Sequence, residues 1–276
     1  MAISSPMTEK PLPVLFVSHG SPMLPFEDIP ARGFMAGLGA RLPRRPEAIL
    51  CVSAHWETPA PAVSTALAPE TIHDFYGFPE ALYRLAYKAP GAPALAERTK
   101  ALLDAAGLPT SIDPARGLDH GAWNPLLLIY PKADIPVTQL SIQHPAGPGH
   151  HFAMGRALKP LRKEGVLILA SGGAVHNLRQ FHVDREKPAA WATGFDDWLA
   201  DRIAAQDAAS LIEYRRLKPE GMQAHPRDEH FLPFFVALGA GEGEVGRPIH
   251  RSFAHGSLSM ASYAWGELAP DQARAA

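Results

Sequence analysis

The sequence predicts an α/β protein, a single domain in which helices flank a mostly parallel central sheet. Short apolar runs without polar alternation indicate strands covered on both faces. They are residues 13–19, 48–55, 135–142 and 166–172. Helical stretches lie between and after these runs, at residues 94–107, 151–165 and 189–206. Gly107 and Gly165 close the first two helices. This alternation of strands and helices favours a parallel sheet.

The chain is expected to form one catalytic domain over residues 13–265, with an N-terminal tail at 1–12 and a C-terminal tail at 266–276. No internal repeat is visible. The Pro/Gly-rich segments 144–151 and 239–248 are too short to separate folding units and are interpreted as loops.

Composition narrows the class of partner. The 276 residues are 46% hydrophobic, and 26 Lys and Arg against 28 Asp and Glu give a net charge of -2. A basic surface for nucleic acid is therefore not expected, and the predicted substrate is a small molecule. No run approaches the roughly 20 apolar residues of a membrane span, and the N-terminus lacks a signal-peptide core, so we expect a cytoplasmic protein without membrane contact. The oligomeric state stays open.

The single cysteine, Cys51, excludes an intrachain disulfide, a cysteine-rich zinc ribbon and an iron–sulfur cluster. Because it lies in the apolar run AILCVSA, Cys51 is expected to be a small buried hydrophobe. Any metal site must therefore use other ligands.

Histidines at strand ends and helix starts supply those ligands. The five candidates are His19 in VSHGSP, His55 in VSAHWE, His120 in LDHGAW, His176 in GGAVHN and His230 in DEHFLP. The carboxyl ends of strands are where the ligand crevice of an α/β protein opens, and neutral imidazole is the commonest protein metal ligand. The pattern predicts a mononuclear metal site at the strand ends.

Each histidine also has a simpler interpretation. His19, before Gly20, could be a turn histidine bonded to a carbonyl, and His120 and His230 could mark helix starts. Two strand ends that each carry a histidine, at His19 and His55, favour the shared site. Asp119, next to His120, could orient a neighbouring ring.

The other histidines lack such a setting. His150 and His151 are adjacent at the start of a predicted helix and cannot both point at one metal. His73 in TIHDFYGFP and His225 in AHP are retained as candidate residues of the substrate pocket. A G-x-S-x-G nucleophile elbow and an H-E-x-x-H zinc motif are absent, and GGAVHN lacks the lysine of a phosphate-binding loop.

Short motifs spread from about residue 13 to 262 resemble the class III extradiol ring-cleavage dioxygenases of the DOPA 4,5-dioxygenase type. The motifs are HGSPM (19–23), SAHW (53–56), TIHDFYGFP (71–79), YKAPGAPALA (87–96), DHGAW (119–123), ASGGAVHNLR (170–179), DEHFLP (228–233) and HGSLSM (255–260). Their order and spread make the resemblance specific.

The resemblance implies an oxidoreductase that inserts both atoms of dioxygen into a catechol, in aromatic compound catabolism. It implies one divalent metal per chain, Fe(II) for ring cleavage or Zn(II), held by His19, His55 and His230. It also implies that His176 is an acid/base residue often counted with the metal ligands, and that His120 faces the substrate. General acid/base catalysis of this kind contributes roughly 100-fold to 10,000-fold.

The sequence departs from the protocatechuate 4,5-dioxygenase branch, whose third ligand is a glutamate. Here His230 matches that place and Glu229 lies beside it. The more neutral site leaves Zn(II) as a competitor to Fe(II), because imidazole binds both. Two other functions stay open at this point: a zinc-dependent hydrolase on the same three histidines, and a non-catalytic metal-binding or signalling protein of the same fold.

Overall fold

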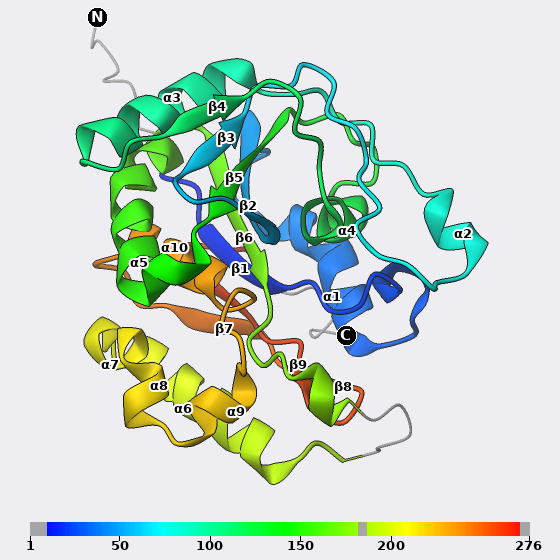
Figure 1. Cartoon of the computed structure of the whole chain (residues 1–276), viewed down its shortest axis with the longest axis vertical. Coiled ribbons are helices and arrows are strands. Elements are labelled where there is room, and N and C mark those ends of the chain that lie inside the picture. Colours follow the sequence, from blue (N-terminus) through cyan, green and yellow to red (C-terminus); the bar gives the residue numbers. More distant parts are fainter. Residues whose placement is uncertain (1–9, 182–186, 271–276) are drawn as a thin grey trace, which may run out of the picture.

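The computed structural model describes residues 10–181 and 187–270. An eight-stranded sheet with the order β4-β3-β5-β2-β6-β1-β10-β7 runs through the middle of the molecule (Figure 1). Its central strands are parallel, and they are β5 (Val137–Ile142), β2 (Ala48–Glu57), β6 (Val166–Gly172) and β1 (Val14–Ser18). The predicted α/β fold and its four apolar strands are thus confirmed.

Shorter strands extend the sheet at both edges. Beside β1, the strands β10 (Ser262–Trp265) and β7 (Arg247–His250) are added in antiparallel pairs. Beside β5, β3 (Ala62–Ser64) pairs antiparallel and β4 (Ser111–Asp113) pairs parallel to β3. A separate hairpin joins β8 (Phe253–Ala254) to β9 (Leu258–Ser259). The sheet is therefore mixed at its edges and parallel where the predicted site lies.

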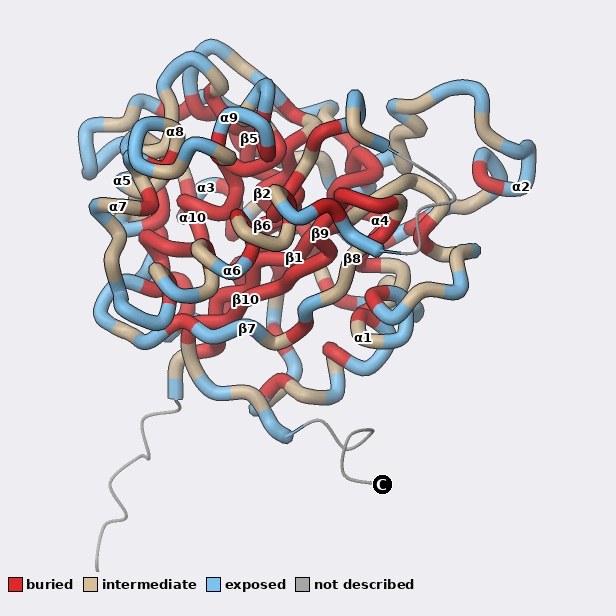
Figure 2. Tube along the Cα trace, turned by 90° about the horizontal axis from the view of Figure 1, so that it is seen from below, coloured by how far each residue is buried: buried red, intermediate tan, exposed pale blue. Residues whose placement is uncertain are grey.

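Helices cover both faces of the sheet, which explains why the central strands carry no polar alternation. One face packs against α3 (Pro93–Ala105), α5 (Gly147–Leu158), α6 (Ala190–Ala204) and α10 (Leu232–Ala240). The other face packs against α1 (Pro30–Leu38) and α4 (His120–Ile129). Cys51 lies fully buried on this second face, as predicted. Figure 2 shows the central strands as the buried interior of the molecule.

Short helices complete the described chain. The α-helical ones are α2 (Glu80–Tyr83), α7 (Ala208–Ile212), α8 (Tyr214–Leu217) and α9 (Glu220–Ala224). The 3-10 turns are η1 (Leu24–Phe26), η2 (Gly39–Arg41), η3 (His144–Ala146), η4 (Lys159–Glu164) and η5 (Leu178–Gln180). Among the described residues, no helix combines the length and the apolar character needed to cross a membrane.

The helix predicted at 151–165 differs from the observed one. Helix α5 begins earlier, at Gly147, with Pro148 in its first turn, where the missing N–H costs nothing. It ends at Leu158, and residues 159–164 continue as a 3-10 turn because Pro160 cannot donate the next helical hydrogen bond. The prediction of a loop over 144–151 is therefore wrong from Gly147 onward.

Packing also continues past the predicted domain limits. The Leu12 side chain is buried, its backbone N–H donates to the Arg162 carbonyl over 3.0 Å, and its carbonyl accepts from Arg162 Nε over 2.8 Å. At the other end, Ala269 N donates to the Arg41 carbonyl over 2.7 Å. The remaining parts of the predicted tails, residues 1–9 and 271–276, lie outside the described residues.

Candidate metal centre

Glycines allow three separate segments to meet at the carboxyl ends of the parallel strands. His19 directly follows β1, and its N–H donates to the Gly172 carbonyl at the end of β6 over 3.0 Å. A Cβ at Gly172 would lie 2.0 Å from the His230 carbonyl oxygen, so only glycine lets the segment before α10 approach β6. Gly173 N then donates to that same carbonyl over 2.8 Å. His230 is thereby fixed beside His19.

His55 lies inside β2 and not at its end, which corrects the predicted position by two residues. The pairing of β2 with β5 shifts register between Val52 and Glu57, around His55. An irregularity of this kind re-aims side chains near functional sites. Helix α4 approaches the same stretch closely, because a Cβ at Gly121 would lie 2.3 Å from Ser53 Oγ and 2.9 Å from His55 Cδ2.

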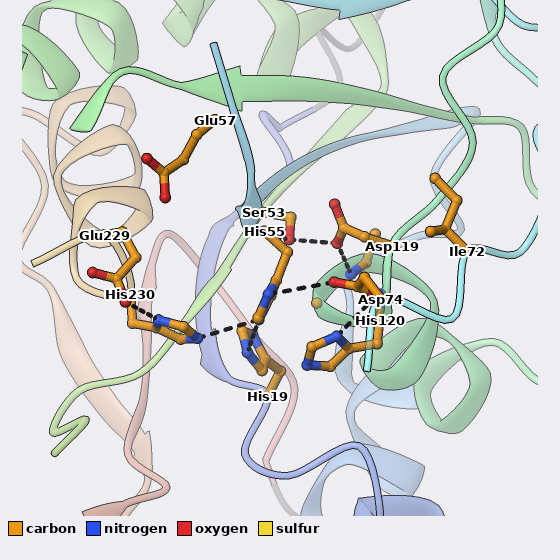
Figure 3. A network of polar contacts seen from close by, with 12 residues as sticks. His19, Ser53, His55, Glu57, Ile72, Asp74, Asp119, His120, Glu229 and His230 are labelled. Carbon is orange, nitrogen blue, oxygen red and sulfur yellow. Dashed lines mark hydrogen bonds and ion pairs between the residues drawn. The ribbon is translucent and has the colours of Figure 1, made fainter. Parts of the chain in front are cut away.

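The three imidazoles point their Nε2 atoms at one another (Figure 3). His55 Nε2 lies 3.1 Å from His19 Nε2 and 3.2 Å from His230 Nε2, and one ring nitrogen from each residue falls within a common 4.8 Å. Nitrogens bound at about 2.1 Å to one ion cannot be more than about 4.2 Å apart. The two measured separations fit that limit.

The opposite ring nitrogens have hydrogen-bond or ion-pair partners. His19 Nδ1 lies 3.0 Å from Ser171 Oγ, whose own hydroxyl donates to the Gly121 carbonyl. His230 Nδ1 lies 2.8 Å from Glu229 Oε1, and His55 Nδ1 lies 3.4 Å from Asp74 Oδ2. Acceptors at Nδ1 hold the proton there and leave the Nε2 lone pair free. Three lone pairs then face one point, an arrangement that suits a divalent cation.

Burial keeps these rings neutral. Desolvation, followed by the neighbouring histidines, lowers the pKa of His19 and of His230 well below the ordinary value. Burial lowers the pKa of His55 to about 3, with His120 acting in the same direction and Asp74 opposing. A metal ligand must be the neutral imidazole, so the three side chains are in the required protonation state at neutral pH.

His120 and His176 lie against the same three rings. The His120 ring centroid is 3.9 Å from that of His55 and 5.5 Å from that of His19. His176 stacks on His230 with centroids 3.6 Å apart and an interplanar angle of 9°. Burial lowers the pKa of His176 to about 4, with a smaller effect from His120. All five histidines singled out in the sequence thus form one cluster.

Asp119 does not orient a histidine ring, contrary to expectation. Its buried carboxylate accepts hydrogen bonds from Ser53 Oγ over 2.6 Å, from Arg116 Nη2 over 2.7 Å and from the Gln139 side chain. It also caps α4 by accepting from Ala122 N over 3.2 Å. Asp119 therefore links the start of α4 to β2 through hydrogen bonds. The carboxylate that contacts the His120 ring is that of Asp74.

The two remaining candidates lie outside the cluster. His73 Nε2 lies 3.0 Å from the Leu85 carbonyl, and the residue lines an open surface hollow of about 450 Å³. The lining of this hollow includes none of the five clustered histidines. His225 is fully buried, stacks on Phe231 with centroids 4.5 Å apart, and places Nε2 3.2 Å from the Gly173 carbonyl. This burial argues against the predicted contact of His225 with a substrate.

The residues that contact the clustered histidine rings were not among the candidates predicted from the sequence. Ser171, Asp74 and Glu229 occupy the Nδ1 sides of the three converging histidines. Phe75 makes a T-shaped contact with His120, with centroids 5.6 Å apart and an interplanar angle of 83°. The motif TIHDFYGFP, which holds Asp74 and Phe75 beside His73, is the sequence signal for these two residues.

Metal-free protein is expected to lose stability as the pH falls below about 6.5. The folded-state pKa is about 3 for His55 and about 4 for His176 and for His151, against a reference of 6.5, so the unfolded chain binds protons that the folded chain does not. Each such group contributes up to about 1.4 kcal/mol per pH unit between those limits. The raised pKa of Glu229, caused by burial, acts in the opposite direction.

Urea unfolding at pH 7, 6 and 5 measures this dependence. We expect the free energy of unfolding to fall by more than about 2 kcal/mol from pH 7 to pH 5. A free energy that stays constant over this interval would show that the buried histidines take up protons in the folded protein as readily as in the unfolded chain.

Comparisons with known proteins cover nearly the whole chain. The family described as the catalytic LigB subunit of aromatic ring-opening dioxygenase matches residues 13–265. A 4,5-DOPA dioxygenase extradiol from Portulaca grandiflora is 45% identical over 253 residues, covering 90% of this chain and 93% of the relative. One from Escherichia coli K12 is 44% identical over 265 residues, covering 93% of this chain and 95% of the relative.

A solved structure has the same fold. The crystal structure of an uncharacterized protein from Escherichia coli K12 superposes with a TM-score of 0.78 at 37% sequence identity. The match covers 92% of this chain and 100% of that one. At this identity and coverage, the similarity extends over the sheet and over the strand ends that carry the histidines.

Proposed function

Because this chain belongs to the LigB family of aromatic ring-opening dioxygenases and is a class III extradiol dioxygenase, we propose a specific reaction for it. The protein opens the ring of a DOPA-like catechol, with Fe(II) bound at its three-histidine site. The family implies an aromatic substrate and dioxygen. The observation that carries the proposal is the convergence of the Nε2 atoms of His19, His55 and His230. The names of the relatives support DOPA as the type of catechol.

We assign the metal to His19, His55 and His230. Three imidazoles are a donor set that suits both iron and zinc, and the Nδ1 partners pre-organise all three rings. When bound, Fe(II) would supply a redox-active centre through which electrons can pass between catechol and dioxygen. Because ring opening by dioxygen is a redox reaction, Fe(II) is proposed in preference to Zn(II).

His176 is proposed as the acid/base residue. Its ring is neutral at physiological pH because burial lowers its pKa to about 4, so it can accept a proton from a catechol hydroxyl group. Its stacking on His230 keeps the imidazole beside the metal ligands. The same ring, once protonated, can return the proton to the reacting oxygen. His176, Glu229 and His230 offer possible ligand atoms that lie within 4.8 Å of one another. The alternative to the acid/base role is therefore that His176 binds the metal as a fourth ligand.

His120 and Phe75 are proposed to face the aromatic substrate. The His120 ring contacts the rings of both His55 and Phe75, so a polar imidazole lies next to an apolar ring. A catechol needs both, because its hydroxyl groups require hydrogen-bond partners and its ring requires apolar contacts. The hydrolase and non-catalytic alternatives gain no support from relatives that carry dioxygenase names.

Substrate preference tests this proposal. With Fe(II)-loaded protein, we expect kcat/KM for DOPA to exceed that for protocatechuate by about 10-fold or more, because the two catechols differ in the side chain that the pocket must accommodate. Oxygen uptake on DOPA, caffeate and protocatechuate gives the rates, and NMR of the yellow muconate semialdehyde identifies the broken ring bond. A preference for protocatechuate, or cleavage between the two hydroxyl-bearing carbons, would contradict the DOPA-like extradiol assignment.

A further inference from the structure

The Asp74 carboxylate lies between two rings with different proposed duties. Its Oδ2 is 3.4 Å from His55 Nδ1, and its Oδ1 is 3.0 Å from His120 Nδ1, both as ion-pair contacts in which the carboxylate charge favours a proton on Nδ1 (Figure 3). Oδ1 also accepts a hydrogen bond from the His120 backbone N–H over 2.9 Å. The scheme above uses Asp74 only as the Nδ1 partner of His55 and leaves its contact with His120 without a role. We propose that Asp74 is a positioning residue that fixes His55 and His120 together in the Nδ1–H form.

The segment that carries Asp74 is itself fixed against helix α4. Ile72 N donates to the Leu118 carbonyl over 2.8 Å, and the Ile72 carbonyl accepts from Trp123 Nε1 over 2.9 Å. Only 22% of the Asp74 side chain is exposed. The carboxylate is thus held in place by contacts on both sides of the start of α4, which is the pre-organisation that a positioning group requires.

The Asp74 carboxylate then determines that the Nε2 atoms of both His55 and His120 are unprotonated. With the proton on Nδ1, His55 presents its Nε2 lone pair to the metal site, next to His19 Nε2 at 3.1 Å. With the proton on Nδ1, His120 presents Nε2 as a hydrogen-bond acceptor and not as a donor. A catechol hydroxyl group would donate to that acceptor. This step rests on the proposed function, whereas the positions of the protons do not.

The two ring centroids are 3.9 Å apart, so rotation of either ring would disturb the other. Asp74 contacts both rings through the same side chain, and it therefore couples the orientation of the proposed metal ligand to that of the residue proposed to face the substrate. Glu229 contacts His230 Nδ1 and Ser171 contacts His19 Nδ1, so neither reaches His120 in this way. Of the three Nδ1 partners, Asp74 is the one that also contacts His120.

The experiment must distinguish the positioning role of Asp74 from a purely structural one, because Asp74 also accepts a hydrogen bond from the first turn of α4. Asp74→Asn keeps the size of the side chain and the oxygen that faces the His120 backbone N–H and His120 Nδ1, but it replaces Oδ2, which faces His55 Nδ1, with an amide nitrogen. Asp207→Asn is the matched control. Asp207 accepts from Ser210 N in the first turn of α7 over 3.0 Å, and its side-chain partner is Arg202.

The test is NMR of metal-free protein labelled with ¹⁵N in its histidine side chains, with His55 and His120 assigned from His→Gln variants. In the wild type we expect both rings to carry the proton on Nδ1. In Asp74→Asn we expect His55 to move toward the Nε2–H form, because an amide N–H then faces its Nδ1 in place of Oδ2. His120 should keep Nδ1–H beside the retained oxygen, and His19 and His230 should keep it because Ser171 and Glu229 are unchanged. The Asp207→Asn spectrum should match that of the wild type.

Turnover gives the second readout. Iron-loaded Asp74→Asn should lose about 10-fold to 100-fold in kcat, as is typical when the carboxylate behind a ligand histidine is replaced. Its melting temperature should match that of Asp207→Asn. A wild-type His55 or His120 that carries its proton on Nε2, or His55 signals unchanged in Asp74→Asn, would overturn the proposal. The spectra need no catalysis, so an inactive wild-type protein would count against the proposed function alone.

Discussion

Replacing His176 by Phe should remove turnover and leave the metal in place, whereas His55→Ala should empty the site. Phe can keep the stacking that His176 makes on His230 at 3.6 Å, but it cannot accept a proton. The expected loss in kcat is about 100-fold to 10,000-fold, the usual contribution of acid/base catalysis. His55 supplies one of three converging nitrogens, and its loss leaves two. Metal per chain and oxygen uptake, measured on the same samples, separate the two effects.

His150→Phe is the matched control for this comparison. His150 is a partly buried histidine on α5 whose Nε2 lies 3.1 Å from Gln143 Oε1, outside the cluster of five. This variant should retain both metal and turnover. If His176→Phe and His55→Ala lose metal equally, His176 is a fourth ligand, and proton transfer belongs to His120 or to water.

The central strands could be predicted from the sequence because their burial on both faces leaves an uninterrupted apolar signal. The run 166–172 matches β6 at both ends, and 13–19 exceeds β1 by one residue at each end. The edge strands carried no such signal. Strand β4 reads SID with two exposed residues, and β7 reads RPIH with two. Short edge strands of this kind are defined by their neighbours and not by their own residues.

The five clustered histidines could be predicted because strand ends and helix starts of an α/β fold converge on one edge of the sheet. The partners of their rings could not. Asp74 lies on a loop whose course depends on contacts with α4, and Glu229 depends on the side-chain conformation next to His230. The surroundings of His225, retained as a candidate residue of the substrate pocket, could not be predicted from its context AHP either, because Tyr214 and Phe231 from other segments enclose the ring.

The measurement that tests the account most directly is oxygen uptake by protein loaded with Fe(II) or with Zn(II), assayed with the same catechol. Ring opening transfers electrons between catechol and dioxygen, and Zn(II), a d¹⁰ ion, has no redox chemistry to support this transfer. We expect the Fe(II) protein to consume one dioxygen per ring opened, with a rate that follows iron content, and the Zn(II) protein to be inactive. Higher turnover by iron-free zinc protein, or activity that persists without oxygen, would contradict the account and favour the hydrolase.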